Sequence, residues 1–146
     1  MNEVRFLVDE REDLDAHEVV PVIDGDLLTD LIEAFEQAAG MDLTGGYGGL
    51  IPAASDPLDQ HFHGNVSGAR PGAKTPLLAC GCGEWGCWPL MARITVTERS
   101  VTWDAFEQPH RATRDYSGFG PFRFDRRRYD AALDGLCSEV AAIFHR

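Results

Sequence analysis

The chain has 146 residues, of which 44% are hydrophobic, so it can bury a core as a single domain spanning residues 1–146. Its net charge of −11 repels phosphate, which argues against nucleic-acid partners and against anionic membrane surfaces. No stretch approaches the roughly 18 apolar residues of a membrane span, and the charged start lacks the pattern of a signal peptide. These features predict a cytoplasmic protein.

The acidic charge lies in the first part of the chain. Residues 1–60 carry fifteen acidic groups against two arginines, whereas residues 61–146 carry eleven basic groups against nine acidic ones. The simplest interpretation is a solvated acidic face that keeps the protein soluble.

Two short strands are predicted near the start of the chain. Residues 4–8 and 18–23 are mostly apolar and rich in valine, which favours strands. Pro21 has no amide hydrogen for a strand ladder, so the second strand is expected at a sheet edge or at a bulge. The charged residues 9–15 predict a turn or loop between them.

An amphipathic helix is predicted next, with Asp26 capping its first amides. Its apolar face follows the helical period and consists of Leu27, Leu28, Leu31, Ile32, Phe35, Ala38 and Ala39. The acidic side chains expected on the solvent face are Asp30, Glu33 and Glu36. Gly40 is expected to end the helix, because glycine readily adopts the left-handed conformation at a helix end.

A long Gly- and Pro-rich loop with at most short elements is predicted over residues 40–76. Strand patterns follow over 77–82, which is a run of apolar residues, and over 87–97 and 101–106, where apolar and polar residues alternate. Their connections are too short for parallel crossovers, so they predict an antiparallel meander.

The last part of the chain predicts a short strand over 120–124 and a helix capped by Asp125. The expected apolar stripe of this helix is Tyr129, Ala132, Leu133, Leu136, Cys137, Val140 and Phe144. Arg126 to Arg128 oppose the helix dipole, so an acidic partner is expected for them. The fold class predicted is α+β, with two amphipathic helices packed on one face of an antiparallel sheet.

The most distinctive motif is a hairpin containing Cys80, Cys82 and Cys87. Cys82 and Cys87 are expected to face each other across a four-residue loop, with Trp85 exposed at its tip and available to a partner. In the simplest interpretation the three cysteines are small buried apolar residues, since free cysteine is among the most buried residue types.

A second interpretation is a zinc site formed by Cys80, Cys82 and Cys87, with His110 as the fourth ligand. The spacing Cys-x-Cys-x4-Cys differs from paired Cys-x2-Cys motifs. An extended segment from Cys80 to Cys82 would also hold its sulfurs about 7 Å apart. Gly81 would therefore have to kink for one ion to reach both.

A third interpretation is a redox site, with a reversible disulfide between Cys82 and Cys87 or one reactive thiolate. No basic residue adjoins these cysteines, and the carboxylate of Glu84 is expected to raise their pKa. Four cysteines without a secretory signal suit a reducing compartment, where thiols or metal ligands are commoner than structural disulfides.

Two other groups are weaker candidates. His61 and His63 lie on one side of a segment predicted to be extended, and they are interpreted as an ordinary loop pair. Arg111 and Arg114 follow a strand end, where guanidinium groups can contact an anionic ligand or a partner. The alternative is a surface turn whose arginines pair with the acidic half of the chain.

Three patterns in the second half of the chain resemble a family of uncharacterised bacterial proteins. They are CxCGxxGCWPL over 80–90, VxWxxFxQPHR over 101–111 and GPFxFDxxxY over 120–129. The resemblance implies a cytoplasmic bacterial protein and transfers no catalytic residue.

No Gly-x-Ser-x-Gly or His-Glu-x-x-His motif occurs in the sequence. Together with the acidic first half, this favours a noncatalytic binding domain that contacts a protein partner or a second copy of itself. The alternative is a zinc-binding or thiol-redox protein that uses the Cys80–Cys87 hairpin.

Overall fold

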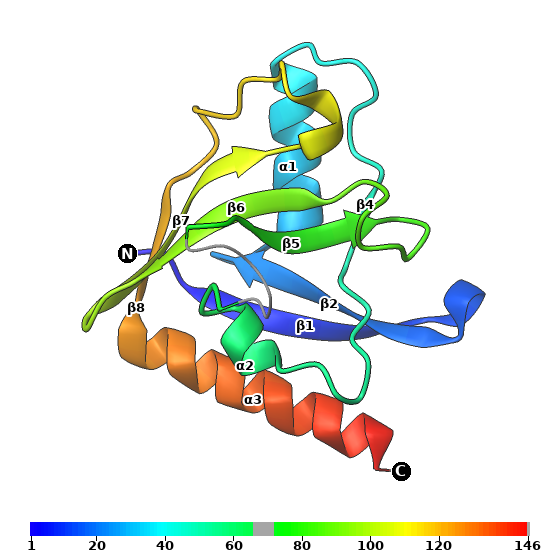
Figure 1. Ribbon diagram of the computed structural model, residues 1–146, viewed down its shortest axis with the longest axis vertical. Helices are drawn as coiled ribbons and strands as arrows, with labels where there is room; N and C mark the ends of the chain where they lie inside the picture. Colours follow the sequence, from blue (N-terminus) through cyan, green and yellow to red (C-terminus); the bar gives the residue numbers. More distant parts are fainter. Residues whose placement is uncertain (66–71, 146) are drawn as a thin grey trace.

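The computed structural model describes residues 1–65 and 72–145 (Figure 1). Its strands are β1 (Val4–Arg11), β2 (Ala16–Ile23), β3 (Asp26–Leu27), β4 (Tyr47–Gly48), β5 (Thr75–Cys80), β6 (Leu90–Val96), β7 (Ser100–Glu107) and β8 (Phe122–Asp125). Its α-helices are α1 (Leu28–Ala38), α2 (Leu58–His61) and α3 (Arg126–Phe144). Two 3-10 turns are η1 (Glu12–Leu14) and η2 (Pro109–Arg111).

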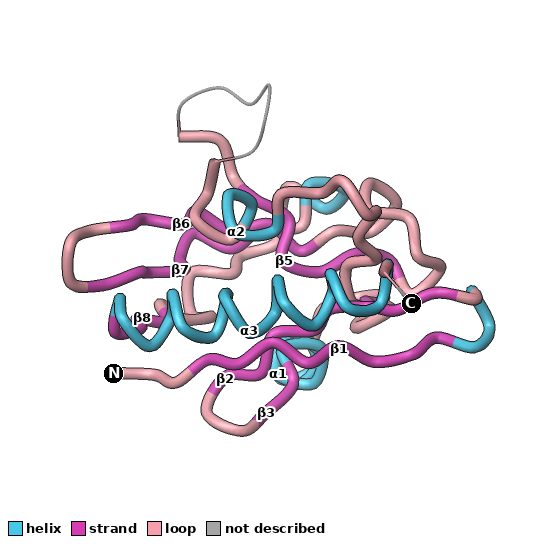
Figure 2. The backbone as a smooth tube through the Cα atoms, turned by 90° about the horizontal axis from the view of Figure 1, so that it is seen from below, coloured by secondary structure: helices cyan, strands magenta, loops and turns pink. Residues whose placement is uncertain are grey.

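Within these residues the strands form two antiparallel sheets, β1-β2-β3 and β4-β5-β6-β7-β8. A bridge between Val19 and Leu50 and another between Asn2 and Phe124 join the sheets. Helix α1 contacts β2 and β3, whereas α3 contacts β1, β7 and β8. Figures 1 and 2 show the helices packed against the curled strands. The predicted α+β class and its antiparallel meander are confirmed.

The first two strands are longer than predicted. They pair from Val4 with Ile23 to Arg11 with Ala16, so the charged connection shrinks to a tight turn. Val19 exchanges hydrogen bonds with Leu50 on the side facing away from β1. The nitrogen of Pro21, two residues later, lies on that same side, away from β1. The missing amide hydrogen of Pro21 therefore removes no hydrogen bond between β1 and β2.

Helix α1 differs from its prediction at four positions, two of which are Ala38 and Ala39, predicted on the apolar face but exposed at the helix end. Asp26 does not cap it, because Asp26 pairs with Ile23 in β3 and Leu27 occupies the cap position without a side-chain bond. Glu36 does not face solvent, since its side chain is completely buried. Gly40 follows the helix with a φ of +71°, as expected of a helix-ending glycine.

Helix α3 begins as predicted, with the Asp125 carboxylate accepting a hydrogen bond from the Arg128 amide at 3.1 Å. Its buried stripe is Tyr129, Leu133, Leu136 and Val140. Phe144 departs from the predicted stripe, because its position in the last turn leaves it 46% exposed. Neither α3 nor any other helix in the described part of the chain is long and apolar enough to cross a membrane.

Two of the three arginines at the start of α3 have the acidic partners that were expected beside the helix dipole. Arg126 pairs with Asp130 at 2.9 Å, one turn further along the helix. Arg128 pairs with Glu3 at 2.9 Å, in the acidic first half of the chain. These contacts place negative charge beside an otherwise unfavourable cluster of cations.

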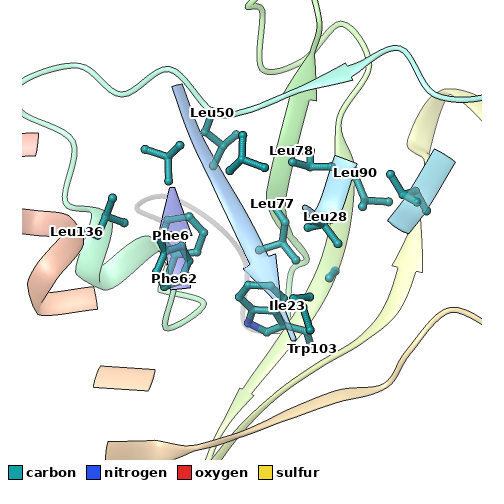
Figure 3. Packing of buried hydrophobic residues seen from close by; sticks show 14 of the residues in the cluster. Phe6, Ile23, Leu28, Leu50, Phe62, Leu77, Leu78, Leu90, Trp103 and Leu136 are labelled. Carbon is teal, nitrogen blue, oxygen red and sulfur yellow. The ribbon is translucent and has the colours of Figure 1, made fainter. Parts of the chain in front are cut away.

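One hydrophobic core lies between the sheets and helices (Figure 3). Phe6, Leu77 and Trp103 come from three different strands and are almost completely buried. The predicted loop 40–76 contains β4, α2 and the start of β5, while its residues 66–71 lie outside the described part. This segment also supplies Leu50, Leu58 and Phe62 to the core, so much of it is anchored by packing.

Gly49 allows the two sheets to approach closely. A Cβ atom at this position would lie 2.7 Å from the Val19 carbonyl oxygen and 2.8 Å from a Val20 methyl group. Neither distance is compatible with an ordinary van der Waals contact, so a larger residue would push the strands apart. The glycine thereby sets the path of the chain into the segment beside the cysteine motif.

Candidate metal centre

The cysteine motif occupies a longer connection than predicted. Strand β5 ends at Cys80 and β6 begins at Leu90, with Leu78 opposite Leu90 in the register. Cys82 and Cys87 therefore lie in the connecting turns and do not face each other across paired strands. Figure 1 shows this connection beside β4.

The three cysteines lie together at this connection. Their Sγ atoms are all within 4.8 Å of one another, Cys80 is half-buried, and Cys82 and Cys87 are exposed. The interpretation as buried apolar residues is therefore wrong for Cys82 and Cys87. This cluster can hold a metal ion. The fourth cysteine of the chain, Cys137, lies on α3 outside the cluster.

A tight turn removes the geometric objection to shared metal binding. The Gly83 amide donates to the Cys80 carbonyl oxygen at 2.9 Å, and Gly83 has a φ of +96°. The Cys82 amide points at the Cys80 sulfur, 3.4 Å away. The predicted separation for an extended Cys80–Cys82 segment does not apply, because the chain turns immediately after Cys80.

The sulfur spacing is close to that of a tetrahedral thiolate site. Zinc–sulfur bonds of about 2.3 Å place the sulfurs of such a site about 3.8 Å apart. The sulfurs of Cys80, Cys82 and Cys87 lie within 4.8 Å of one another, so shifts of about 1 Å suffice to bind one ion. Side-chain rotations at the two exposed cysteines can provide such shifts.

The thiols differ in acidity. The pKa of Cys82 is lowered, because the Cys80 sulfur and the Glu84 backbone amide stabilise its thiolate. Hydrogen bonds to Cys80 and Cys82 retain the proton of Cys87 and raise its pKa to about 11. The Glu84 carboxylate does act to raise the pKa of Cys82, as predicted, but the neighbouring sulfur and the backbone donor outweigh it.

Metal affinity is expected to rise with pH. Cys87 is protonated below its pKa of about 11, and a metal ion must displace this proton. Between pH 6 and pH 8 this residue alone should increase the apparent affinity by about tenfold per pH unit. Chelator competition at several pH values measures the slope, and an affinity that does not change over this range would contradict thiolate ligation.

His110 lies next to the cluster but outside the group of mutually close ligand atoms. Its Nε2 atom is 2.7 Å from the carbonyl oxygen of Gly86, the residue before Cys87. The imidazole is exposed and belongs to η2, which follows β7. Its predicted role as a fourth ligand stays a prediction, in which Nδ1 would bind the ion while Nε2 keeps its bond to Gly86.

Trp85 is not the exposed loop tip that the sequence suggested. Its indole N–H donates to the Ile51 carbonyl oxygen at 3.1 Å, and its ring lies edge-on to His61 with centroids 5.6 Å apart. The ring is half-buried against the core because the connection folds back onto the segment after β4. Trp85 thus anchors the cysteine-bearing turn.

The two histidines of the predicted loop pair have separate structural roles. His61 ends α2 and is buried, and its Nε2 atom lies 2.7 Å from the Pro76 carbonyl oxygen. His63 lies 2.8 Å from an Asp130 carboxylate oxygen on α3. The segment is a helical turn and not extended, and burial lowers the pKa of His61.

A shallow groove of about 360 Å³ runs beside the cluster. The chain from Leu43 to Gly46 forms one side, and Cys80, Cys87 and Trp88 form the other. The Trp88 indole N–H donates to the Gly45 carbonyl oxygen at 2.9 Å, which links the two sides and fixes the ring.

The two arginines named as candidate contacts have different environments. The guanidinium carbons of Arg111 and Arg114 lie 5.0 and 5.6 Å from the Trp88 ring centroid. Arg114 also pairs with Glu36 at 3.1 Å and its side chain is only 8% exposed, so it belongs to the interior. Arg111 is exposed and remains accessible to a ligand.

The buried carboxylate of Glu36 supports the chain that lines the groove. Glu36 accepts hydrogen bonds from the Gly45 amide at 2.8 Å and from the Tyr47 hydroxyl at 2.8 Å. The Tyr116 hydroxyl also donates to it, and Arg114 balances its charge. Five polar groups from three segments thus converge in the interior, which the sequence did not indicate.

This network supports the strand and loop that carry the first cysteine. Tyr47 pairs with Cys80 between β4 and β5, and the Gly81 amide donates to the Gly46 carbonyl oxygen at 2.8 Å. Gln108 donates to the Tyr47 hydroxyl at 3.2 Å. Burial and the neighbouring Glu36 carboxylate raise the pKa of Tyr47, which keeps its hydroxyl a donor.

Arg11 supports the cysteine-bearing turn from the opposite side. Its guanidinium donates to the Gly81 carbonyl oxygen at 2.8 Å and pairs with Glu18 at 3.0 Å. Glu18 also accepts from the Gly49 amide at 2.9 Å. The pKa of Arg11 is raised by Asp13 and Glu18, so this clamp stays charged.

Comparison of the chain with protein-family models, curated proteins and solved structures gives no match. The resemblance of its second half to a bacterial family therefore stays a prediction.

Proposed function

We propose that the protein binds zinc through the thiolates of Cys80, Cys82 and Cys87. The supporting observation is the convergence of three sulfurs to within 4.8 Å of one another at one turn. Two adjacent supports, Arg11 on the Gly81 carbonyl and the Gly46 carbonyl on the Gly81 amide, hold this turn in place. Such preorganisation reduces the cost of assembling the ligands around an ion.

A metal site explains the cluster better than a disulfide does. A disulfide joins two sulfurs, whereas here Cys80, Cys82 and Cys87 are mutually close. All three are free thiols, which suits a metal site in a reducing compartment. The lowered pKa of Cys82 also supplies the first thiolate that an incoming ion requires.

Zinc is the preferred ion among the chemical alternatives. Soft thiolate ligands select zinc, copper(I) and iron–sulfur clusters over magnesium or calcium. A tetrahedral zinc ion needs four ligands, and three thiolates with one further ligand satisfy it. Cys82 and Cys87 are exposed and none of the three cysteines belongs to the buried core, so we infer that the apo-protein keeps its fold.

The contribution of His110 is tested by replacing it with alanine. We expect His110→Ala to change zinc affinity by less than about threefold, because its imidazole is bonded to Gly86 and lies outside the cluster. Competition with a chromophoric chelator measures the affinity. A loss as large as that caused by removing a cysteine would assign His110 to the first coordination sphere.

The hypothesis of a noncatalytic interaction domain is compatible with zinc binding. The acidic first half of the chain favours a docking role, but the cysteine cluster is the feature with a defined chemistry. Zinc content and affinity test the proposed function, and size-exclusion chromatography of the zinc-loaded chain tests self-association.

A further inference from the structure

The groove beside the cysteines lies at the coordination sphere of the proposed ion. Cys80 and Cys87 form part of its wall, whereas Cys82 does not contribute to it. Because three thiolates leave one position of a tetrahedral ion for another ligand, an incoming molecule can reach the ion along this groove. Its volume of about 360 Å³ lies at the lower end of the range for small-molecule sites.

We propose that the groove binds a low-molecular-weight thiol carrying a carboxylate, whose sulfur becomes the fourth metal ligand. This inference rests on the proposed metal site. A thiolate is the ligand that a soft, sulfur-rich centre prefers over an oxygen ligand. The groove that Cys80 and Cys87 line would give an outside ligand access to the fourth position of the ion, unlike a structural centre closed by four protein ligands.

Arg111 supplies the complement for the carboxylate. Its guanidinium lies 5.0 Å from the Trp88 ring centroid, and Trp88 lines the groove. One nitrogen donates to the His110 carbonyl oxygen at 2.8 Å, and Arg111 makes no ion pair within residues 1–65 and 72–145. Its remaining donors can therefore bind a carboxylate, whereas those of Arg114 are used by Glu36 and the chain near Leu43.

The binding step is a ligand exchange without a change of oxidation state. The thiol loses its proton to solvent, its sulfur lone pair forms the bond to zinc, and a coordinated water molecule leaves. The carboxylate stays ionised and pairs with Arg111. The net charge at the ion becomes more negative by one, while the separate charge of the carboxylate is the one that Arg111 balances.

The test uses the full chain loaded with cobalt(II), whose absorption reports both geometry and thiolate ligation. We expect 3-mercaptopropionate to add thiolate-to-cobalt absorption in a saturable manner, and to bind more tightly than 2-mercaptoethanol, which lacks the carboxylate. Propionate, which lacks the thiol, should leave the spectrum unchanged. Arg111→Ala should weaken 3-mercaptopropionate by about two- to fivefold. Arg127→Ala, an equal loss of charge at the exposed start of α3, should have no effect.

The outcomes separate this inference from the proposed function. If cobalt gives no thiolate absorption, the metal site itself is wrong. If thiolate absorption is present, the metal site stands. The ligand inference is then overturned if 3-mercaptopropionate does not bind and leaves the absorption unchanged, or if it removes the metal from the protein. If Arg111→Ala and Arg127→Ala weaken the binding of 3-mercaptopropionate equally, Arg111 does not contact the ligand and the proposed carboxylate contact is overturned.

Discussion

Replacing Glu36 with alanine should destabilise the protein by about 3–5 kcal/mol. The carboxylate is completely buried, and the substitution leaves the Arg114 guanidinium, which is 8% exposed, without its counter-charge. It also removes the acceptor of the Gly45 amide and the Tyr47 hydroxyl. Buried donors without acceptors add to the loss. Denaturant unfolding of the metal-free protein measures the change.

Glu33→Ala is the matched control for this experiment. Glu33 lies on the same helix three residues earlier, but its side chain is exposed, so its removal should change stability by less than about 0.5 kcal/mol. Similar losses for the two variants would contradict the role assigned to the buried carboxylate. Because the network supports the chain beside Cys80, we also expect Glu36→Ala to weaken metal binding.

Replacing Cys82 with serine should reduce zinc affinity by more than about 100-fold. The variant removes one of three direct ligands, and the loss of an indirect supporting contact alone typically costs about 10–100-fold. Cys82 is also the thiol whose pKa is lowered, so the variant removes the most readily formed thiolate of the cluster. Chelator competition at constant pH measures the effect.

Cys137→Ser controls for the loss of a thiol elsewhere. Cys137 is half-buried on α3 and lies outside the cluster, so this variant should bind zinc as the unmodified chain does. The metal-free Cys82→Ser protein should keep the stability of the metal-free parent, because Cys82 is exposed. Wild-type affinity in Cys82→Ser would mean that its sulfur is not a ligand.

Local patterns predicted most of the fold. Alternation in β6 and β7 and the cap at Asp125 depend on neighbouring residues, and the structure reproduces them. The way the two sheets meet depends instead on long-range bridges between Val19 and Leu50 and between Asn2 and Phe124, for which the sequence carries no local signal. The predicted cap at Asp26 is wrong because Asp26 belongs to a two-residue strand that pairs with β2.

Glu36 illustrates how a helical pattern can be misinterpreted. Leu28, Ile32 and Glu36 follow one another at four-residue spacing, so all three occupy the buried face of α1. The charge of Glu36 suggested a solvent-exposed position, but its four-residue spacing from Ile32 correctly indicates the buried face. Its partner Arg114 lies 78 residues away in the chain, and no pattern within the helix could indicate that ion pair.

The candidate site was predictable in its residues and not in its geometry. The spacing of Cys80, Cys82 and Cys87 identified the motif, while the assumption of an extended chain made their sulfurs seem too distant. The turn at Gly83 and the support from Arg11, 70 residues earlier in the chain, bring them together. Local composition does not encode contacts of that range.

The metal content of the protein purified without chelators tests the central claim most directly. After expression with added zinc, elemental analysis should find about one zinc per chain. Three of the four cysteines should resist a thiol reagent until a chelator is added. A protein without stoichiometric zinc whose cluster thiols react at once would contradict the metal centre.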